Sequence, residues 1–335
     1  MSGDIAIDLG TANILIYIKE KGIVLREPSM VAVNKDTNDV IAIGKKASEM
    51  LGRTPSNIEV VKPLKDGVIS NFTLTAKMLK HYIKKTAKNK FFQPRIMICV
   101  PSQITEVEKR AVIDVAMDSG AKNVYLIEEP VAAAIGAGID ILKPSGNLVI
   151  DIGGGTTDIA VISLGSTIIS STTKVAGNKF DETLIKFIKR RYRLVIGEKT
   201  AENVKKTIGC VYPRVENTKM NIRGRSIDTG LPAEIEIKSN DIMQPLLNDC
   251  FKIVDAVRNI IEKTPPELVE DISNKGIYMT GGGSLLFGFD KLIEKCTGIK
   301  VMIAEDAISC VAIGTGKALE NIDKINKLRL ESSNK

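Results

Sequence analysis

Several residue types that mark particular protein classes are scarce or missing in this chain. Its 335 residues include no tryptophan and one histidine, and aromatic residues make up 4% of the total. No apolar run reaches the roughly 18 residues that a membrane-spanning helix needs. The N-terminus enters an apolar strand at once, without the charged and apolar segments of a signal peptide. We therefore expect a cytoplasmic protein.

Cysteine is also sparse, and its spacing excludes common metal and redox sites. The five cysteines are odd in number and never approach the CxxC spacing of zinc ribbons and redox motifs. Most of them lie among apolar residues, so we interpret them as reduced thiols of the core. They are Cys99, Cys210, Cys250, Cys296 and Cys310.

Low-complexity tracts are absent, and apolar residues make up 44% of the chain. This composition predicts ordered structure almost throughout. A chain of 335 residues exceeds what one hydrophobic core usually supports, so we expect two domains, or one domain with large insertions.

Acidic residues are missing from one long segment, between Asp66 and Glu106. The cations inside this gap equal the net charge of +7; they are Lys77, Lys80, Lys84, Lys85, Lys88, Lys90 and Arg95. The pattern predicts a basic surface region that attracts phosphates of lipid headgroups or of nucleic acid.

Apolar periodicity predicts the main elements. Short runs rich in β-branched residues at 5–9, 14–18, 23–25 and 31–33 indicate a β-meander. A helical period follows over 74–83, then a buried strand at 96–100 and a helix over 105–119. Thr105 with Glu108 three residues later forms a capping-box pattern at the start of that helix.

From Asn147 the plan of the chain repeats. Apolar strands at 148–152, 159–164 and 167–173 follow one another much as those over 4–25 do. Each segment has an Asp near a strand end with a glycine turn after it. We infer duplicated α/β domains that face one another, with a boundary near residues 143–146.

Three glycine turns are candidate phosphate or nucleoside sites. They are Asp8-Leu9-Gly10-Thr11-Ala12-Asn13, Asp151-Ile152-Gly153-Gly154-Gly155-Thr156-Thr157-Asp158 and Thr280-Gly281-Gly282-Gly283. Glycines permit positive φ and let backbone N–H groups converge on phosphate oxygens. An Asp at each strand end could hold Mg²⁺ through waters. The third turn precedes a helical stretch, whose N-terminus would favour an anion or a polar nucleoside edge.

Each turn alone is also compatible with plain turn chemistry, the first turn most of all. Three consecutive glycines in the second turn, however, destabilise a strand pair by roughly 0.5–1 kcal/mol each, which requires compensation. None of the turns is a P-loop or a Rossmann fingerprint. The nucleotide would therefore lie between two domains.

The order of these turns, with Glu128-Glu129-Pro130-Val131-Ala132-Ala133-Ala134 between the first two, resembles the actin, Hsp70 and sugar-kinase superfamily. The whole chain is similar to the MreB bacterial actins, with matching segments at 8–13, 51–55, 65–69, 126–138, 151–164, 265–268, 280–283 and 310–320. The resemblance implies an α/β, actin-like ATPase fold of two duplicated RNase H-like domains. Each would carry a smaller subdomain, with the nucleotide in the cleft between the domains.

The resemblance also implies subdomain boundaries. Subdomain IA would comprise residues 1–32, 66–144 and 319–335, and IB residues 33–65. Subdomain IIA would comprise 145–180 and 246–318, and IIB residues 181–245.

The site residues that the resemblance implies fall into three groups. Glu129 would orient the attacking water, with Thr156 and Asp151 as its catalytic partners near the γ-phosphate and Mg²⁺. Asp8 and Asp151 would serve the Mg²⁺ shell. ATP or ADP would contact Thr11, Ala12, Asn13, Gly153, Gly154, Gly155, Glu202, Lys205, Gly281, Gly282 and Gly283.

Glu129 also has a plain structural interpretation, because Glu and Pro are both favoured in the first turn of a helix. Phosphoryl transfer to water, however, needs in-line positioning of the water and neutralised phosphate oxygens more than a covalent catalyst. A glutamate could supply the first requirement, and Mg²⁺ with backbone N–H groups the second.

The family resemblance places a membrane-contacting loop in the basic region. Phe91 and Phe92 could insert shallowly while Lys88 and Lys90 meet anionic lipid at the inner face of the cell membrane. Alternatively, the two Phe pack into the core. Nucleic acid is a weaker alternative, because no module typical of its recognition is present.

The resemblance implies a filament-forming cytoskeletal ATPase for cell shape or motility, with slow ATP hydrolysis. Its partners would be copies of itself in paired protofilaments, an anionic membrane, and other family members or cell-shape proteins. The alternatives are a monomeric ATPase or kinase of the same fold and an Hsp70-like module. The last would need a peptide-binding domain after residues 314–320, and the given chain ends soon after them, at residue 335.

Overall fold

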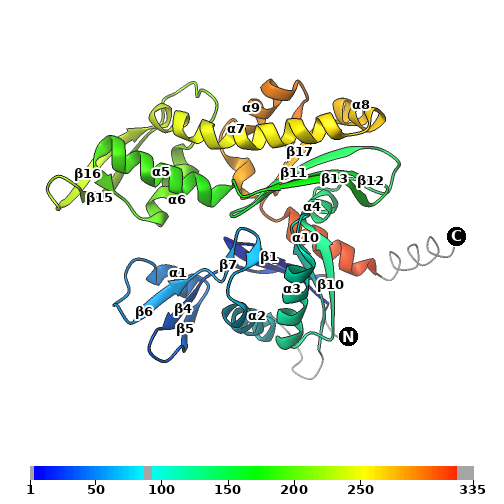
Figure 1. Ribbon diagram of the computed structural model, residues 1–335, viewed down its shortest axis with the longest axis horizontal. Helices are drawn as coiled ribbons and strands as arrows, with labels where there is room; N and C mark the ends of the chain where they lie inside the picture. The colour runs from blue at the N-terminus through cyan, green and yellow to red at the C-terminus, as the bar shows by residue number, and fades with distance from the viewer. Residues whose placement is uncertain (1–3, 87–92, 323–335) are drawn as a thin grey trace. The chain divides into compact units, whose positions relative to one another are not determined.

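The computed structural model describes residues 4–86 and 93–322, and Figure 1 shows their helices and strands. Contacts divide the chain into two compact units. Unit 1 comprises Met1–Lys143, Leu164–Ser166 and Ile308–Lys335, and unit 2 comprises Pro144–Ser163 and Thr167–Ala307.

Unit 1 is built on a five-stranded sheet in the order β10-β9-β1-β2-β3. The strands are β1 (Ile5–Leu9), β2 (Asn13–Ile18), β3 (Gly22–Pro28), β9 (Arg95–Val100) and β10 (Asn123–Glu128). β1 pairs antiparallel with β2 and parallel with β9, which pairs parallel with β10. Layers on both faces bury the central strand, which explains why β1 is almost continuously apolar.

Unit 2 contains a five-stranded sheet in the order β13-β12-β11-β17-β18. The strands are β11 (Asn147–Ile152), β12 (Thr157–Ser163), β13 (Ser166–Thr173), β17 (Ile277–Thr280) and β18 (Val301–Ile303). β11 pairs antiparallel with β12 and parallel with β17, which pairs parallel with β18. The strand order and these directions repeat those of unit 1, so the predicted duplication of an α/β domain is confirmed.

The fourth predicted strand belongs to a different sheet from the meander. β4 (Val31–Asn34) pairs with β5 (Val40–Ile43) and β6 (Ile58–Val61) in a small sheet, beside helix α1 (Lys45–Met50). Pro28 ends β3, and proline cannot donate to a strand ladder, so the chain leaves the large sheet there. The prediction of one meander through residue 33 was therefore wrong in its last strand.

The first two long helices of unit 1 agree with the predicted pattern. α2 (Phe72–Thr86) buries Leu74, Met78, Leu79, Tyr82 and Ile83. α3 (Glu106–Asp118) begins with the predicted capping box: Glu108 N donates to Thr105 Oγ1 at 3.2 Å, and Thr105 N donates to Glu108 Oε2 at 2.9 Å.

Two helices far apart in sequence pack closely in unit 1: α4 (Glu129–Gly136) and α10 (Cys310–Glu320). A Cβ at Gly314 would clash with the carbonyl oxygen of Ala132, and one at Gly136 would clash with that of Cys310. Glycine is therefore required at this helix crossing. The resemblance put residues 310–318 in the second domain, whereas this packing places them in unit 1. The finer division into four subdomains stays a prediction.

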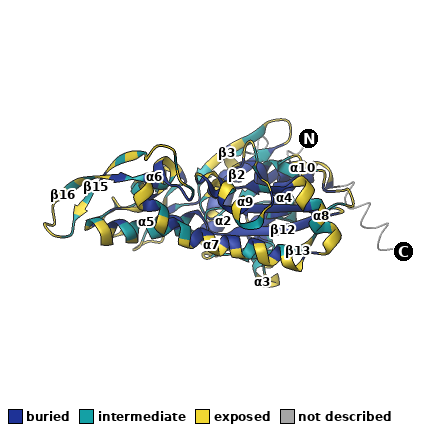
Figure 2. Cartoon of the chain, turned by 90° about the horizontal axis from the view of Figure 1, so that it is seen from above, coloured by how far each residue is buried: buried dark blue, intermediate teal, exposed yellow. Residues whose placement is uncertain are grey.

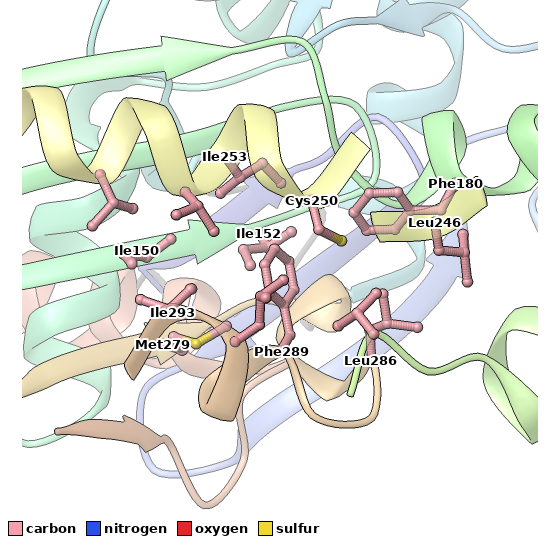
Figure 3. Packing of buried hydrophobic residues seen from close by; sticks show 14 of the residues in the cluster. Ile150, Ile152, Phe180, Leu246, Cys250, Ile253, Met279, Leu286, Phe289 and Ile293 are labelled. Atoms are coloured by element: carbon pink, nitrogen blue, oxygen red, sulfur yellow. The ribbon is translucent and has the colours of Figure 1, made fainter. Parts of the chain in front are cut away.

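Unit 2 is mainly helical outside its sheet. Its helices are α5 (Gly177–Tyr192), α6 (Glu198–Ile208), α7 (Ser239–Lys263), α8 (Pro266–Lys275) and α9 (Phe289–Thr297). Figure 3 shows side chains of β11, β17, α5, α7 and α9 converging in one core. Phe180 and Phe289 meet edge to face in this core, with ring centroids 6.4 Å apart.

A second small sheet completes unit 2, in the order β14-β15-β16. It consists of β14 (Leu194–Val195), β15 (Lys219–Ser226) and β16 (Pro232–Lys238). Exposed and more buried positions alternate along β15 and β16, as the colours of Figure 2 show. This alternation is typical of a sheet with one packed face and one solvated face.

Candidate functional site

The first glycine turn connects β1 to β2 in unit 1, and Ser29 holds it in place. Ser29 is fully buried; its Oγ donates to Gly10 O at 2.7 Å and its N donates to Ala12 O at 3.0 Å. Within the part of the chain that the structure describes, the N–H groups of Thr11 and Ala12 have no hydrogen-bond acceptor. The turn therefore keeps two backbone donors available for an anion.

Thr11 links this turn to a second hairpin of unit 1. Strands β7 (Leu64–Lys65) and β8 (Val68–Ile69) are joined by Asp66 and Gly67, which both have positive φ. Gly67 N donates to Thr11 Oγ1 at 2.9 Å. Because Thr11 Oγ1 accepts this hydrogen bond, its own hydroxyl proton is free to donate elsewhere.

Asp8 lies near the end of β1 and is half-buried. Burial raises the pKa of this carboxyl from 3.8 to about 6, and a hydrogen bond from Cys99 Sγ to Oδ1, 3.4 Å long, opposes the rise. The pKa of Cys99 is raised well above its usual value by burial and then by the negative charges of Asp8 and Glu129. Glu129, the first residue of α4, thus acts electrostatically on the same thiol as Asp8.

The second glycine turn connects β11 to β12 in unit 2. Gly153 N donates to Thr156 O at 2.9 Å, which closes the turn. The first N–H groups of α5, from Gly177 and Asn178, donate to Gly153 O and Gly154 O at 3.1 and 2.8 Å. These bonds offset part of the conformational cost of the glycines. No acceptor within the described residues binds the N–H of Gly154 or Gly155.

Asp151 and the third glycine turn are assembled around β11. Thr280 on β17 is in register with Asp151 on β11, and the Thr280 hydroxyl donates a hydrogen bond to Asp151 Oδ1, with 2.6 Å between the oxygens. Gly281 has φ 79°, and a Cβ there or at Gly283 would clash with Ile152. The third turn therefore rests directly on the strand that leads into the second turn.

The helical stretch after the third turn differs from the prediction. Residues Gly282–Leu285 form one short 3-10 turn, and the next α-helix begins only at Phe289. A single turn has too few aligned peptide dipoles to favour an anion strongly. A Cβ at Gly282 would contact nothing within 4 Å, so internal packing does not require glycine there.

The two residues assigned to the adenosine half lie on α6. Lys205 is largely buried, and its Nζ donates to Gly177 O and to Asp181 Oδ2, both at 2.8 Å. Lys205 thereby fixes the start of α5 beside the second glycine turn. Glu202 is more exposed and pairs with Lys206 at 2.6 Å.

Comparison with known proteins assigns the family. The family model described as MreB/Mbl protein matches residues 2–327. The chain belongs to the MreB/Mbl family.

Individual MreB/Mbl relatives match along nearly the whole chain. The cell shape-determining protein Mbl of Bacillus subtilis is 51% identical over 328 residues, which is 98% of each chain. The cell shape-determining protein MreB of Escherichia coli is 49% identical over 328 residues, covering 96% of this chain and 94% of the relative.

Solved structures of the family agree with the fold. The crystal structure of MreB5 of Spiroplasma citri bound to AMPPNP superposes with a TM-score of 0.93 at 43% identity, over 98% of each chain. The same protein bound to ADP gives 0.93 at 42% identity, over 98% of this chain and 99% of the other. A MamK double helical filament, 22% identical with a TM-score of 0.78 over 95% of this chain and 99% of the other, shares the fold. The predicted actin-like fold is confirmed.

Two points from the sequence analysis can be compared with the structure. The glycines of the three turns permit positive φ, but only Gly281 among them has it. Gly10 is required for space, because a Cβ there would lie 2.8 Å from Asn13 O. The proposed membrane residues Lys88, Lys90, Phe91 and Phe92 lie outside the described residues.

The described part of this MreB/Mbl chain groups the assigned residues by unit. Unit 1 brings Asp8, Glu129 and the start of the first turn around Cys99. Unit 2 brings Asp151 and the third turn together around β11, and the second turn and Lys205 together at the start of α5. Sequence reasoning missed Ser29, Gly67 and Asp181, whose supporting roles depend on contacts between distant segments.

Two features of the described residues bear on metals and membranes. No group of three or more His, Cys, Asp or Glu side chains there could enclose a metal ion by itself. A Mg²⁺ ion at Asp8 or Asp151 would therefore need water or phosphate ligands. None of the helices in the described ranges is long and apolar enough to cross a bilayer.

Proposed function

We propose that this chain is a bacterial actin that binds ATP, hydrolyses it slowly and assembles into filaments with nucleotide-dependent stability. The observation that carries the ATP assignment is the pair of matching turns at the ends of β1 and β11. Each turn leaves two backbone N–H groups without an acceptor in the described residues. Unpaired backbone N–H groups in a glycine turn fit phosphate oxygens. The nucleotides in the MreB5 structures support the same assignment.

The phosphate contacts would come from both turns. In unit 1, Thr11, Ala12 and Asn13 would contact phosphate oxygens, with the free hydroxyl proton of Thr11 as an added donor. In unit 2, Gly153, Gly154 and Gly155 would do so through the backbone. The adenosine half is assigned to Glu202, Lys205 and the third turn (Gly281, Gly282 and Gly283). Open space beside Gly282 fits close approach of a ligand to its backbone.

Mg²⁺ is assigned to Asp8 and Asp151 through waters. When bound, Mg²⁺ would neutralise charge on the phosphate oxygens. The chemistry of the two carboxylates fits this role, because Mg²⁺ prefers oxygen ligands, and hydrogen bonds from Cys99 and Thr280 hold the two groups in place. The raised pKa of Asp8 indicates a carboxylate with little compensating charge of its own, which a cation would stabilise.

Glu129 is proposed to orient and polarise the attacking water, with Thr156 and Asp151 nearby in the reaction. Glu129 begins α4, where Pro130 follows it and fixes the start of the helix. Thr156 is buried and its carbonyl closes the second turn, so its side chain is held by the same turn that would contact phosphate.

The first experiment measures phosphate release and sedimentation together for the full chain, with and without ATP. Wild-type protein is expected to release phosphate slowly and to form pelletable polymer. Glu129→Gln should lower turnover by roughly 10²-fold or more while ATP binding persists. Glu128→Gln, which makes the same charge change one residue earlier, serves as the control and should change turnover little.

The outcomes distinguish the alternatives. ATP turnover without polymer at any nucleotide or lipid condition would favour a monomeric ATPase or kinase of the same fold. Equal turnover in both Gln variants would remove the catalytic assignment of Glu129.

Membrane association at the inner face of the cell membrane is a further part of the proposal, as are paired protofilaments and contacts with other family members or cell-shape proteins. Its sequence basis is the pair Phe91 and Phe92 flanked by Lys88 and Lys90. Phe91→Ser with Phe92→Ser should weaken binding to anionic vesicles if these side chains insert. Unchanged binding would assign the two phenylalanines to packing instead.

A further inference from the structure

The two chain segments that carry the residues assigned to the adenosine half come together just after those residues, in unit 2. The loop over residues 209–214 follows α6, and residues 285–288 end the third glycine turn and continue beyond it. Cys210 and Phe287 form an isolated parallel β-bridge, and Val211 N donates to Phe287 O at 2.9 Å. The two segments are therefore joined directly, although they are far apart in the sequence.

Two glycines allow this close approach. A Cβ at Gly288 would clash with Tyr212, and Gly288 also has φ 77°, a conformation that favours glycine. A Cβ at Gly209, the residue after α6, would lie 2.9 Å from Leu286 Cδ1. The backbones at the junction are thus packed against the opposite segment.

One cation–π pair spans the junction. The Arg214 guanidinium carbon Cζ lies 4.1 Å from the centroid of the Phe287 ring, and Arg214 Nη2 donates to Gly209 O at 3.2 Å. Burial raises the pKa of Cys210, and the charge of Arg214 opposes the rise, which places the guanidinium near the β-bridge. Arg214 therefore holds the end of α6 and the segment after the third turn at once. We call this pair the Arg214–Phe287 clasp.

The guanidinium has few other partners. Within the described residues Arg214 forms no ion pair with a carboxylate, and its buried Nε has no hydrogen-bond acceptor. Lys291 Nζ lies 5.9 Å from the same ring, near the limit of a cation–π interaction. Phe287 is 38% exposed, so the ring serves the clasp more than it fills the core.

Each of the two segments is also anchored separately within unit 2. Lys205 ties α6 to α5, because its Nζ donates to Gly177 O and to Asp181 Oδ2. The third turn rests on β11 at Ile152. These anchors hold each segment against its own neighbour. The junction joins the two segments to each other and so fixes the spacing between them.

We infer that Arg214 and Phe287 are positioning residues for the nucleoside. The inference rests on the proposed binding of ATP, whose adenosine half is assigned to α6 and the third turn. The clasp holds these two segments at the spacing that accepts this half. Neither residue is assigned to the phosphates, to Mg²⁺ or to the attacking water. The clasp therefore acts on the affinity for ATP and not on phosphoryl transfer.

The test measures, for the full chain, the dissociation constant of ATP and the rate of phosphate release at saturating ATP. Arg214→Gln removes the cation and keeps an N–H donor for Gly209 O. Phe287→Leu removes the ring and keeps an apolar side chain, whereas Phe287→Tyr keeps the ring. The control is Arg258→Gln. Arg258 on α7 donates to Cys296 O on α9, a similar link elsewhere in unit 2.

We expect Arg214→Gln and Phe287→Leu each to weaken ATP binding by roughly tenfold, whereas Phe287→Tyr and Arg258→Gln should bind ATP like wild type. Phosphate release at saturating ATP should stay within about twofold of wild type in every variant. The double variant, Arg214→Gln with Phe287→Leu, should lose no more affinity than either single variant, because one change already opens the clasp.

Several results would overturn the inference. Wild-type affinity in both single variants would do so while leaving ATP binding by the chain intact. Additive losses in the double variant would show that the two residues act independently. A parallel fall in phosphate release at saturating ATP, or an equal loss in Arg258→Gln, would assign the effect to general damage to unit 2. Failure of wild-type protein to bind ATP would instead overturn the proposed function, and this inference with it.

Discussion

The two five-stranded sheets place a carboxylate at equivalent points but surround it differently. Asp8 in β1 and Asp151 in β11 occupy the same place in the repeated strand order. The register of β1 with β9 brings Cys99 beside Asp8, whereas the register of β11 with β17 brings Thr280 beside Asp151. The thiol donates at 3.4 Å and the hydroxyl at 2.6 Å.

This difference shows how one duplicated frame can hold two carboxylates with distinct properties. A thiol is a weak donor, so it compensates little for the burial that raises the pKa of Asp8 to about 6. A hydroxyl hydrogen bond to a carboxylate is stronger and fixes the orientation of Asp151. We expect Asp8 to depend on an external cation more than Asp151 does.

The largest predicted effect concerns the core of unit 2. Phe289 is fully buried against Phe180 in unit 2. Phe289→Ala should lower the free energy of unfolding by about 3–5 kcal/mol, because it removes contacts and leaves a cavity. Chemical denaturation measures the loss, and hydrogen exchange should rise more in β11 than in β1. Phe251→Ala, at an exposed position of α7, is the control, and an equal loss there would contradict this account.

The next effect concerns the two carboxylates directly. In the unfolded chain Asp8 ionises near pH 3.8, whereas in the folded protein its pKa is about 6. The contribution of Asp8 to the free energy of unfolding is therefore fully present below pH 3.8 and is lost as the pH rises through about 6. At neutral pH the loss amounts to up to about 3 kcal/mol. Asp8→Asn should recover this stability at neutral pH and change little in acid.

Asp151→Asn provides the matched comparison. The amide oxygen can still accept from Thr280, so the free energy of unfolding should stay within about 1 kcal/mol of wild type. Denaturation at neutral and at acid pH measures both variants. If the two Asn variants changed stability equally at neutral pH, the contrast between the carboxylates would fail.

A third prediction uses pH to separate Asp8 from the rest of the site. Protonation of Asp8 would compete with Mg²⁺, so turnover should decline by roughly tenfold per pH unit below about pH 6. Raising the Mg²⁺ concentration should restore part of the loss. Phosphate release measured between about pH 5 and 8 gives the profile. A flat profile across that range would exclude Asp8 as the titrating group.

The smallest effect comes from exchanging the donors. Cys99→Thr gives Asp8 a hydroxyl donor, which should lower the pKa of Asp8 and raise the free energy of unfolding by about 1 kcal/mol at neutral pH. The acidic decline in turnover should then move to lower pH. Thr280→Cys is the reciprocal variant and should destabilise unit 2 by a similar amount. An unmoved pH profile in Cys99→Thr would show that the neighbouring donor does not set this pKa.

Much of the local structure was predictable from sequence alone. The period of α2, the capping box of α3 and the strands around the glycine turns depend on neighbouring residues, so short patterns were enough. The repetition of strand, Asp and glycine turn also predicted the duplicated domain. The family resemblance added residue roles that no local pattern contains.

Contacts between distant segments decided the rest. Ser29 holds the first turn through its hydrogen bond to Gly10. Helix α10 packs on α4 at Gly136 and Gly314, and residues 310–318 therefore belong to unit 1. Strand register placed Cys99 beside Asp8, and packing space, not positive φ, explained Gly10. The sequence determined which elements form because their preferences are local. Only tertiary structure decided which side chains and backbone groups meet, because those contacts depend on segments that fold together from far apart in the chain.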